Sequence, residues 1–338
     1  MDTLHELQAT VAALTAPGKG ILAADESSGT IAKRFDAVGL ASTGEHRRAY
    51  RELLISTPDL GRYISGIILY EETLGQAAAD GTPLPQLAAR LGIVPGIKVD
   101  RGKVALAGAP GDDITEGLDG LAQRLQGYRK QGARFAKWRA VYNVSDELPS
   151  RLAIRANAEA LARYAAICQA EGIVPIVEPE VLSDGGHTFE RCAEVTEAVQ
   201  HAVFHALYRH RVALEGMLLK PNMIVPGQRH AATSVPAVAD ATLRVLRRSV
   251  PPAVPGVVFL SGGQGPEEAT AHLDAMNRSG PLPWRLSFSY GRALQDPVLK
   301  AWRGDAAQRA TAQAALLKRA RLNSAASTGR YDVASEAD

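Results

Sequence analysis

The chain has 338 residues, enough for one large domain or two ordinary ones, and 46% of them are hydrophobic, ample for a sizeable core. Its 38 lysine and arginine residues nearly balance 36 aspartate and glutamate residues, giving a formal net charge of +2. So small an excess, spread along the chain, argues against a nucleic-acid-binding or membrane-binding surface. No apolar run is long enough to span a bilayer.

The first fifteen residues have a helical pattern, with an acid at position 2. They lack the basic start and the cleavage site of a signal peptide, so we expect a cytoplasmic protein. The two cysteines, Cys168 and Cys192, fall in predicted helices without metal-ligand spacing. They fit reduced structural thiols of a cytosolic protein.

The dominant pattern is a short apolar run, a polar or glycine-rich corner and then a helical stretch. Strands are predicted at 20–25, 64–70, 95–100, 133–139, 173–179, 216–221, 256–262 and 285–290. Helices are predicted at 118–131, 152–171, 188–209, 235–248, 266–277 and 293–319. Alternation of this kind, with nearly continuous apolar strands, indicates a parallel sheet buried on both faces.

Eight such strands predict an α/β fold, a single (β/α)₈ TIM barrel preceded by an N-terminal helix. The alternative is an open doubly wound sheet, which is weaker because no G-x-G-x-x-G corner follows the first strand. We expect the barrel domain to cover residues 1–323. Residues 324–338 are small, polar and weakly acidic, and are predicted to form a flexible C-terminal tail.

Ionisable side chains lie at the ends of the predicted strands, where a barrel places its chemistry. They are Asp25, Lys98, Asp100, Lys137, Arg139, Glu178, Glu180 and Lys220. Residues two apart in a strand share a face, so Lys137 continues the row of Phe135, and Glu178 that of Ile176. Charges that continue inward-facing apolar rows are costly unless they are paired or used. Alternating signs around the whole mouth predict a site for an anionic substrate.

Lys220 closes an apolar run and is followed at once by Pro221. Its amine is therefore expected at the edge of an apolar interior. Desolvation and a second nearby cation favour the neutral form of a lysine amine, which is a nucleophile for carbonyl carbons. Alternatively, Lys220 extends its charge out of a strand end.

Each of the other charges also has a structural interpretation. Asp25 could cap the helix that follows, although Thr30 is the better cap. Glu178 could pair with Lys137 or Lys220, and Glu180 could be structural. Asp100 and Arg101 are expected to form a solvated pair, and His187 to belong to a helix start.

Two glycine-containing corners predict phosphate binding. Ser261-Gly262-Gly263 follows the seventh strand, and Gly291-Arg292 follows the eighth. Glycines let backbone N–H groups approach an anion, and these two loops form the usual phosphate site of this fold. Arg139, on the far side of the mouth, could hold a second phosphate through its fork of donors.

Together these segments resemble class I, Schiff-base-forming fructose-1,6-bisphosphate aldolase. The matching stretches occur in family order from about residue 18 to about residue 302: GKGILAADES, GIKVD, GARFAKWR, GIVPIVEPE, LEGMLLKPNM, VPGVVFLSGGQG and FSYGRALQ. The resemblance implies a (β/α)₈ barrel, homo-oligomeric and typically tetrameric. It also implies reversible cleavage of the hexose bisphosphate into dihydroxyacetone phosphate and glyceraldehyde 3-phosphate, with no metal or cofactor.

The resemblance also implies roles for individual residues. Lys220 resembles the Schiff-base lysine, Glu178 the acid/base for dehydration, Asp25 the carboxylate serving the C4 hydroxyl, and Lys137 the lysine that assists carbinolamine formation and cleavage. Glu180 is included with the catalytic set. The implied phosphate contacts are Lys98 and Arg139 for C6 and Ser261, Gly262, Gly291 and Arg292 for C1, with Ser27 and Arg34 at lesser contact positions.

Some family members end in a tyrosine that assists protonation of the enamine. This sequence ends in Asp338, and Tyr331 aligns with an internal tail position, so the proton carrier is left open. Three alternatives to the function also remain: a metal-dependent aldolase, another Schiff-base barrel such as a transaldolase, and a non-catalytic phosphosugar-binding scaffold. The 8 scattered histidines disfavour the first.

Overall fold

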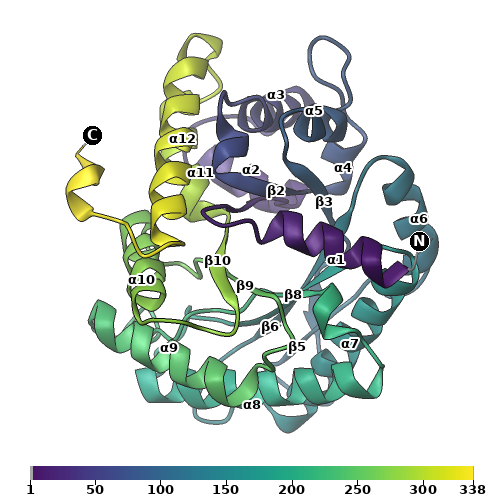
Figure 1. Cartoon of the computed structure of the whole chain (residues 1–338), viewed down its shortest axis with the longest axis vertical. Helices are drawn as coiled ribbons and strands as arrows, with labels where there is room; N and C mark the ends of the chain where they lie inside the picture. The colour runs from purple at the N-terminus through teal and green to yellow at the C-terminus, as the bar shows by residue number, and fades with distance from the viewer. Residues whose placement is uncertain (1–2, 338) are drawn as a thin grey trace.

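Eight parallel strands close into a barrel in the computed structural model of the chain, which describes residues 3–337. Around the barrel the strands follow the order β1-β10-β9-β8-β7-β6-β3-β2. Figure 1 shows most of these strands at the centre of the molecule, with helices around them. Their bounds are β1 Gly20–Ala24, β2 Ile64–Leu69, β3 Val94–Lys98, β6 Phe135–Tyr142, β7 Val174–Val181, β8 Leu218–Leu219, β9 Gly256–Phe259 and β10 Arg285–Tyr290. The prediction of a (β/α)₈ barrel with an N-terminal helix is confirmed.

Helices surround the barrel, and a short antiparallel ribbon of β4 (Lys103–Ala105) and β5 (Asp113–Thr115) follows β3. The helices are α1 Thr3–Leu14, α2 Ser28–Asp36, α3 Gly44–Ile55, α4 Glu71–Leu74, α5 Leu84–Arg90, α6 Leu121–Lys130, α7 Arg151–Ala170, α8 Phe189–Arg209, α9 Val235–Ser249, α10 Pro266–Arg278, α11 Arg292–Trp302 and α12 Arg309–Ala326. Within residues 3–337, none of them has both the length and the apolar character of a membrane span.

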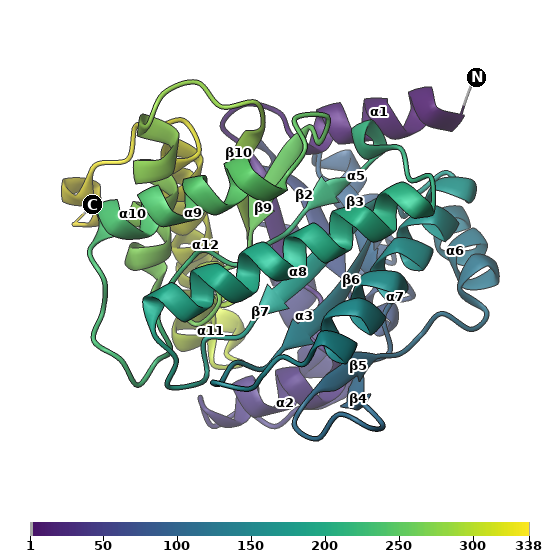
Figure 2. The same ribbon diagram turned by 90° about the horizontal axis from the view of Figure 1, so that it is seen from below.

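The barrel interior is an apolar core that α1 closes at one end. Leu7, Val11 and Leu14 of α1 join inward-facing strand residues, among them Phe135 and Ile176, in one buried cluster. Figure 2 shows α1 at this end of the barrel, with α2 and the β4–β5 ribbon at the other. The predicted inward rows are thus correct, and the charges that continue them point to the end opposite α1.

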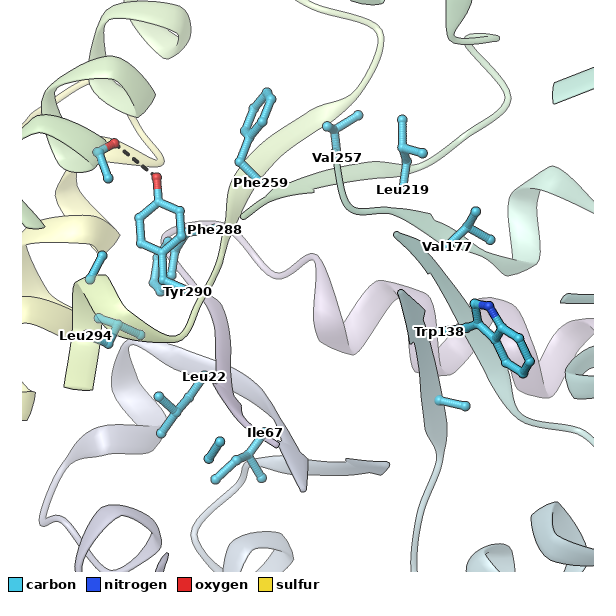
Figure 3. Close-up of a cluster of buried hydrophobic side chains, with 14 of the residues drawn as sticks. Leu22, Ile67, Trp138, Val177, Leu219, Val257, Phe259, Phe288, Tyr290 and Leu294 are labelled. Atoms are coloured by element: carbon cyan, nitrogen blue, oxygen red, sulfur yellow. Dashed lines mark hydrogen bonds between the residues drawn. The ribbon is translucent and has the colours of Figure 1, made fainter. Parts of the chain in front are cut away.

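A second, larger core lies between the strands and the surrounding helices. Figure 3 shows its outward-facing strand residues, including Leu22, Trp138, Val177 and Leu219. These residues alternate with the inward-facing ones along each strand, as the period of two requires. Because both faces of the sheet are covered with apolar side chains, the strands hold the charged residues at their ends in fixed positions.

Two predicted elements differ from the structure. The strand expected at 216–221 is reduced to Leu218–Leu219, because residues 214–216 form a 3₁₀ turn and Pro221 follows Lys220. The helix expected at 293–319 is two helices, α11 and α12. It breaks where Arg303 and Gly304 adopt left-handed conformations, with φ of 47° and 82°.

The C-terminal segment packs beside α10 and α12. Helix α12 continues to Ala326, three residues past the expected boundary at 323, and a 3₁₀ turn spans Val333–Glu336. Arg319 donates to both carboxylate oxygens of Glu336 at 2.6 Å, and the Tyr331 hydroxyl donates to Glu336 at 2.8 Å. The division of the chain at 323, and the mobility of the tail, stay predictions.

Candidate active site

Four buried charged side chains converge at the mouth of the barrel. Asp25 follows β1, Lys137 is on β6, Glu178 is on β7 and Lys220 follows β8, and none is more than 8% exposed. Nζ of Lys137 lies 2.7 Å from Oδ2 of Asp25 and 3.2 Å from Oε2 of Glu178. Nζ of Lys220 lies 3.1 Å from Oε1 of Glu178. The four groups therefore form one chain of alternating charges.

The charges in this chain stabilise one another. Burial by itself would raise the pKa of Asp25, but the ammonium groups of Lys137 and Lys220 outweigh it and hold the pKa well below its usual range. Burial would also raise the pKa of Glu178, but the same two lysines outweigh it and lower that pKa. Burial would lower the pKa of Lys137, yet Asp25 and Glu178 raise it well above its usual value. Both carboxylates are thus ionised beside a charged lysine.

A cavity of about 370 Å³ opens beside this cluster and contains three of the predicted substrate-binding residues. Ser27, Lys98 and Arg139 all line it. Nζ of Lys98 lies 2.5 Å from Oδ1 of Asp100, and Arg139 forms an ion pair with Glu180. The cavity therefore presents cations that are already paired with buried carboxylates.

The interpretation of Asp100 as a solvated loop residue was wrong. Asp100 is only 7% exposed, and besides Lys98 it accepts hydrogen bonds from the backbone N–H groups of Gly102 and Arg139. Its carboxylate ties the end of β3 to β6, next to Lys137. The i, i+2 spacing of Lys98 and Asp100 was the available signal.

The glycine corner after β9 is shaped by two residues with positive φ. Gly262 and Gly263 have φ of 54° and 84°, and the Ser183 hydroxyl donates to the Gly262 carbonyl oxygen at 2.6 Å. A Cβ placed on Gly263 would lie 3.7 Å from Nη2 of Arg292, so the guanidinium reaches this corner from the loop after β10. The loops that follow β9 and β10 thus meet here, and phosphate binding by Ser261, Gly262, Gly291 and Arg292 stays a prediction.

Ser27 precedes the first residue of α2, and Arg34 lies in the last turn of the same helix. The cap of this helix is Ser27, whose hydroxyl accepts from the Thr30 N–H at 3.4 Å, so the assignment of the cap to Thr30 or Asp25 was wrong. Arg34 forms an ion pair with Glu26, a buried residue that the sequence reasoning missed. Glu26 also forms an ion pair with Arg51, in which Oε2 lies 2.7 Å from Nη2.

The remaining sequence candidates lie outside this cluster. His187 precedes Thr188, whose side chain caps α8, as the helix-start interpretation requires. Cys168 and Cys192 are buried and free. Across residues 3–337, no group of three or more His, Cys, Asp or Glu side chains has the arrangement of a metal site.

Comparisons with known proteins all point to one family. The family model described as fructose-bisphosphate aldolase class-I matches residues 6–338. A probable fructose-bisphosphate aldolase class 1 from Xylella fastidiosa is 53% identical over 331 residues, which cover 97% of this chain and 99% of the relative. Fructose-bisphosphate aldolase 5, cytosolic, from Arabidopsis thaliana is 54% identical over 327 residues, covering 96% and 91%. A solved structure of fructose-bisphosphate aldolase from Plasmodium falciparum has a TM-score of 0.97 and 51% identity, covering 98% and 96%.

Proposed function

Because the chain belongs to the class I fructose-bisphosphate aldolase family, we propose that the charged cluster at the barrel mouth is its active site and that Lys220 forms the Schiff base. The reaction is the reversible aldol cleavage of fructose 1,6-bisphosphate to dihydroxyacetone phosphate and glyceraldehyde 3-phosphate, a step of glycolysis. The contact of Lys220 with Glu178 at 3.1 Å carries the proposal, because it joins a nucleophile to an acid/base.

Formation of the Schiff base needs Lys220 and Glu178 together. Ionised Glu178 accepts a proton from the Lys220 ammonium, and the resulting amine attacks C2 of the ketose. Glu178 then returns that proton to the carbinolamine hydroxyl, which leaves as water, and an iminium remains on Lys220. Lys137, 3.2 Å from Glu178, holds that carboxyl in place and stabilises its charge between these steps.

Cleavage of the C3–C4 bond needs a base for the C4 hydroxyl. Asp25 is ionised, because the charge of Lys137 lowers the pKa of its buried carboxyl. It accepts the hydroxyl proton while the C3–C4 electron pair moves into the iminium. Glyceraldehyde 3-phosphate leaves, and an enamine of dihydroxyacetone phosphate stays attached to Lys220. Protonation at C3 and hydrolysis of the iminium release the second product.

Two phosphate sites hold the substrate across this cluster. We assign the C6 phosphate to Lys98 and Arg139 in the 370 Å³ cavity, and the C1 phosphate to Ser261, Gly262, Gly291 and Arg292. Ser27 and Arg34 make lesser contacts, and Glu180 orients Arg139. Anchoring both ends of the sugar converts binding energy into orientation of C2–C4.

Borohydride trapping tests the assignment of the nucleophile. Reduction in the presence of dihydroxyacetone phosphate should leave one covalent adduct, located by mass spectrometry on Lys220. Lys220→Met should abolish both the adduct and triose phosphate production, whereas Lys130→Met, at an exposed lysine in the last turn of α6, should change neither. An adduct on another lysine would refute the assignment.

We further propose that the protein works in the cytoplasm as a homo-oligomer, with four subunits, and needs no metal. Relatives in Arabidopsis and spinach that bear the words cytosolic or cytoplasmic in their names support the location. Light scattering of the purified protein tests the subunit number, and cell fractionation tests the location. Full activity after EDTA treatment would support the metal-free reaction, and its loss would contradict it.

A further inference from the structure

Asn222 connects the strand that carries Glu178 to the segment that carries Lys220. It lies two residues after Lys220 and is 4% exposed. Its Oδ1 accepts from the backbone N–H of Val181 at 3.1 Å. Its Nδ2 donates to Thr196 Oγ1 and to the Met223 carbonyl oxygen, each at 3.1 Å. One buried amide thus joins the end of β7, helix α8 and its own loop.

The backbone does not provide this connection. Strand β8 has only two residues, and its ladder with β7 ends with the Lys220 N–H donating to the Val177 carbonyl oxygen at 2.8 Å. Pro179 has no N–H to donate at the next position along β7. Val181, two residues further, donates to the Asn222 side chain in place of a backbone carbonyl.

The hydrogen bond from Val181 to Asn222 and the backbone bond from Lys220 to Val177 lie on either side of the Glu178–Lys220 pair. Glu178 directly follows Val177, and Lys220 directly follows Leu219, so both side chains leave the backbone just where the ladder ends. The Val177–Lys220 bond holds one end of the unpaired interval, and the Val181–Asn222 bond holds the other. Without the second bond, the Lys220 segment would be fixed to β7 on one side only.

We propose that Asn222 is a positioning residue that keeps the Lys220 amine within proton-transfer distance of the Glu178 carboxyl. The inference rests on the roles proposed above for Lys220 and Glu178. A displacement of about 1 Å at a reacting group can cost roughly 10²-fold in rate. The phosphate contacts lie on other strands and loops, so substrate binding should change much less than the chemical step.

The test measures kcat, KM and the rate of borohydride trapping at Lys220 for Asn222→Ala. We expect kcat and the trapping rate to fall by roughly 10²-fold, with KM changed by no more than about threefold. If the alanine variant does not fold, Asn222→Ser replaces it, because a serine hydroxyl is too short to reach the Val181 N–H. The same fall is then expected.

Two variants on α8 serve as matched controls. Thr196→Val removes a hydrogen-bond partner of Nδ2 but leaves the bond from Val181 to Oδ1. Gln200→Ala removes a buried amide that accepts from Ser249, one turn along α8 from Thr196 and without a hydrogen bond to Asn222. Both should lower the thermal midpoint while keeping kcat and the trapping rate close to those of the unmodified chain.

Equal trapping rates for Asn222→Ala and Gln200→Ala would overturn the inference, since Asn222 would then act on stability alone. A Thr196→Val variant as slow as Asn222→Ala would also overturn it, because the Val181 bond would not be the cause. If the adduct of the unmodified chain forms on a lysine other than Lys220, the proposed function itself fails. An adduct at Lys220 that forms at the normal rate in the Asn222 variants is a different result: it contradicts the role of Asn222 and leaves the proposed function intact.

Discussion

Lys137 contacts both carboxylates of the site, and its shorter ion pair, 2.7 Å from Nζ to Oδ2, is with Asp25. Asp25 follows β1 and Lys137 is on β6, with β2 and β3 between these strands in the barrel, and both side chains are buried. The pair therefore crosses the mouth and links the proposed C4-hydroxyl base to the Glu178–Lys220 pair.

Lys137→Met should slow the reaction and shift its pH dependence. Loss of the cation raises the pKa of Asp25, so the acidic limb of the kcat/KM profile should move to higher pH. We expect kcat to fall by roughly 10²–10³-fold, the range for loss of one group that stabilises charge at the reacting centre. Leaving the buried Asp25 carboxylate without its ion pair should also cost about 3–5 kcal/mol of stability, whereas Glu178 keeps its contact with Lys220. An acidic limb at its original pH would contradict the coupling of Lys137 to Asp25.

Stability should fall in acid. The pKa values of Asp25 and Glu178 are lowered in the folded protein. Their contribution is therefore fully present above the carboxyl pKa of the unfolded chain, near 4, and is lost as the pH falls below it. Thermal unfolding followed from pH 7 to pH 3 checks this. The loss should be shallower in Lys137→Met, because Asp25 then has less stabilisation to lose. Parallel curves for the two proteins would argue against this origin.

Arg139→Ala should separate one-phosphate from two-phosphate substrates. If Arg139 binds the C6 phosphate, its loss should raise KM for fructose 1,6-bisphosphate by at least about tenfold, the loss of one charge-assisted contact. Cleavage of fructose 1-phosphate should stay nearly constant. Steady-state kinetics with both sugars checks the assignment, and an equal loss on both would place Arg139 elsewhere in the mechanism.

Gly263→Ala should weaken binding of the C1 phosphate. At φ of 84° an alanine costs roughly 1–2 kcal/mol, and its Cβ would lie 2.5 Å from Nε2 of Gln228. We expect a raised KM for the bisphosphate and for fructose 1-phosphate alike. Gly265→Ala is the matched control, because Gly265 has φ of −60° and no atom within 4 Å of the added Cβ. An equal effect of both substitutions would mean that loop geometry is not the cause.

The position of the proposed catalytic residues at the barrel mouth could be predicted, because each lies at the end of an apolar strand whose inward and outward residues alternate. The alternation of Phe135 with Lys137 is local information, and the structure preserves it. Contacts made across the fold could not be predicted in the same way. Glu26 is held by Gln295, 269 residues later, at 2.9 Å, and Asn222 by Val181 and Thr196. Such partners depend on how the barrel closes and leave no periodic signal in the sequence.

The break between α11 and α12 at Arg303 and Gly304 is a second feature that the sequence did not predict. Residues 293–319 are rich in alanine, leucine and other helix-forming residues, so the sequence alone predicts one helix. The left-handed backbone at the two residues ends α11 regardless of that pattern. Gly304, a glycine inside a long helical pattern, is the local feature that indicates this break.

The seal that α1 makes with Leu7, Val11 and Leu14 has a consequence for the order in which products depart. Because apolar side chains fill one end of the barrel, the site is open at the other end only. Both trioses must therefore leave through the same opening by which the hexose enters. The ketone half is still bonded to the enzyme after cleavage, so the aldehyde half has to clear the passage first. The reverse synthesis must then load its two reactants in the opposite order.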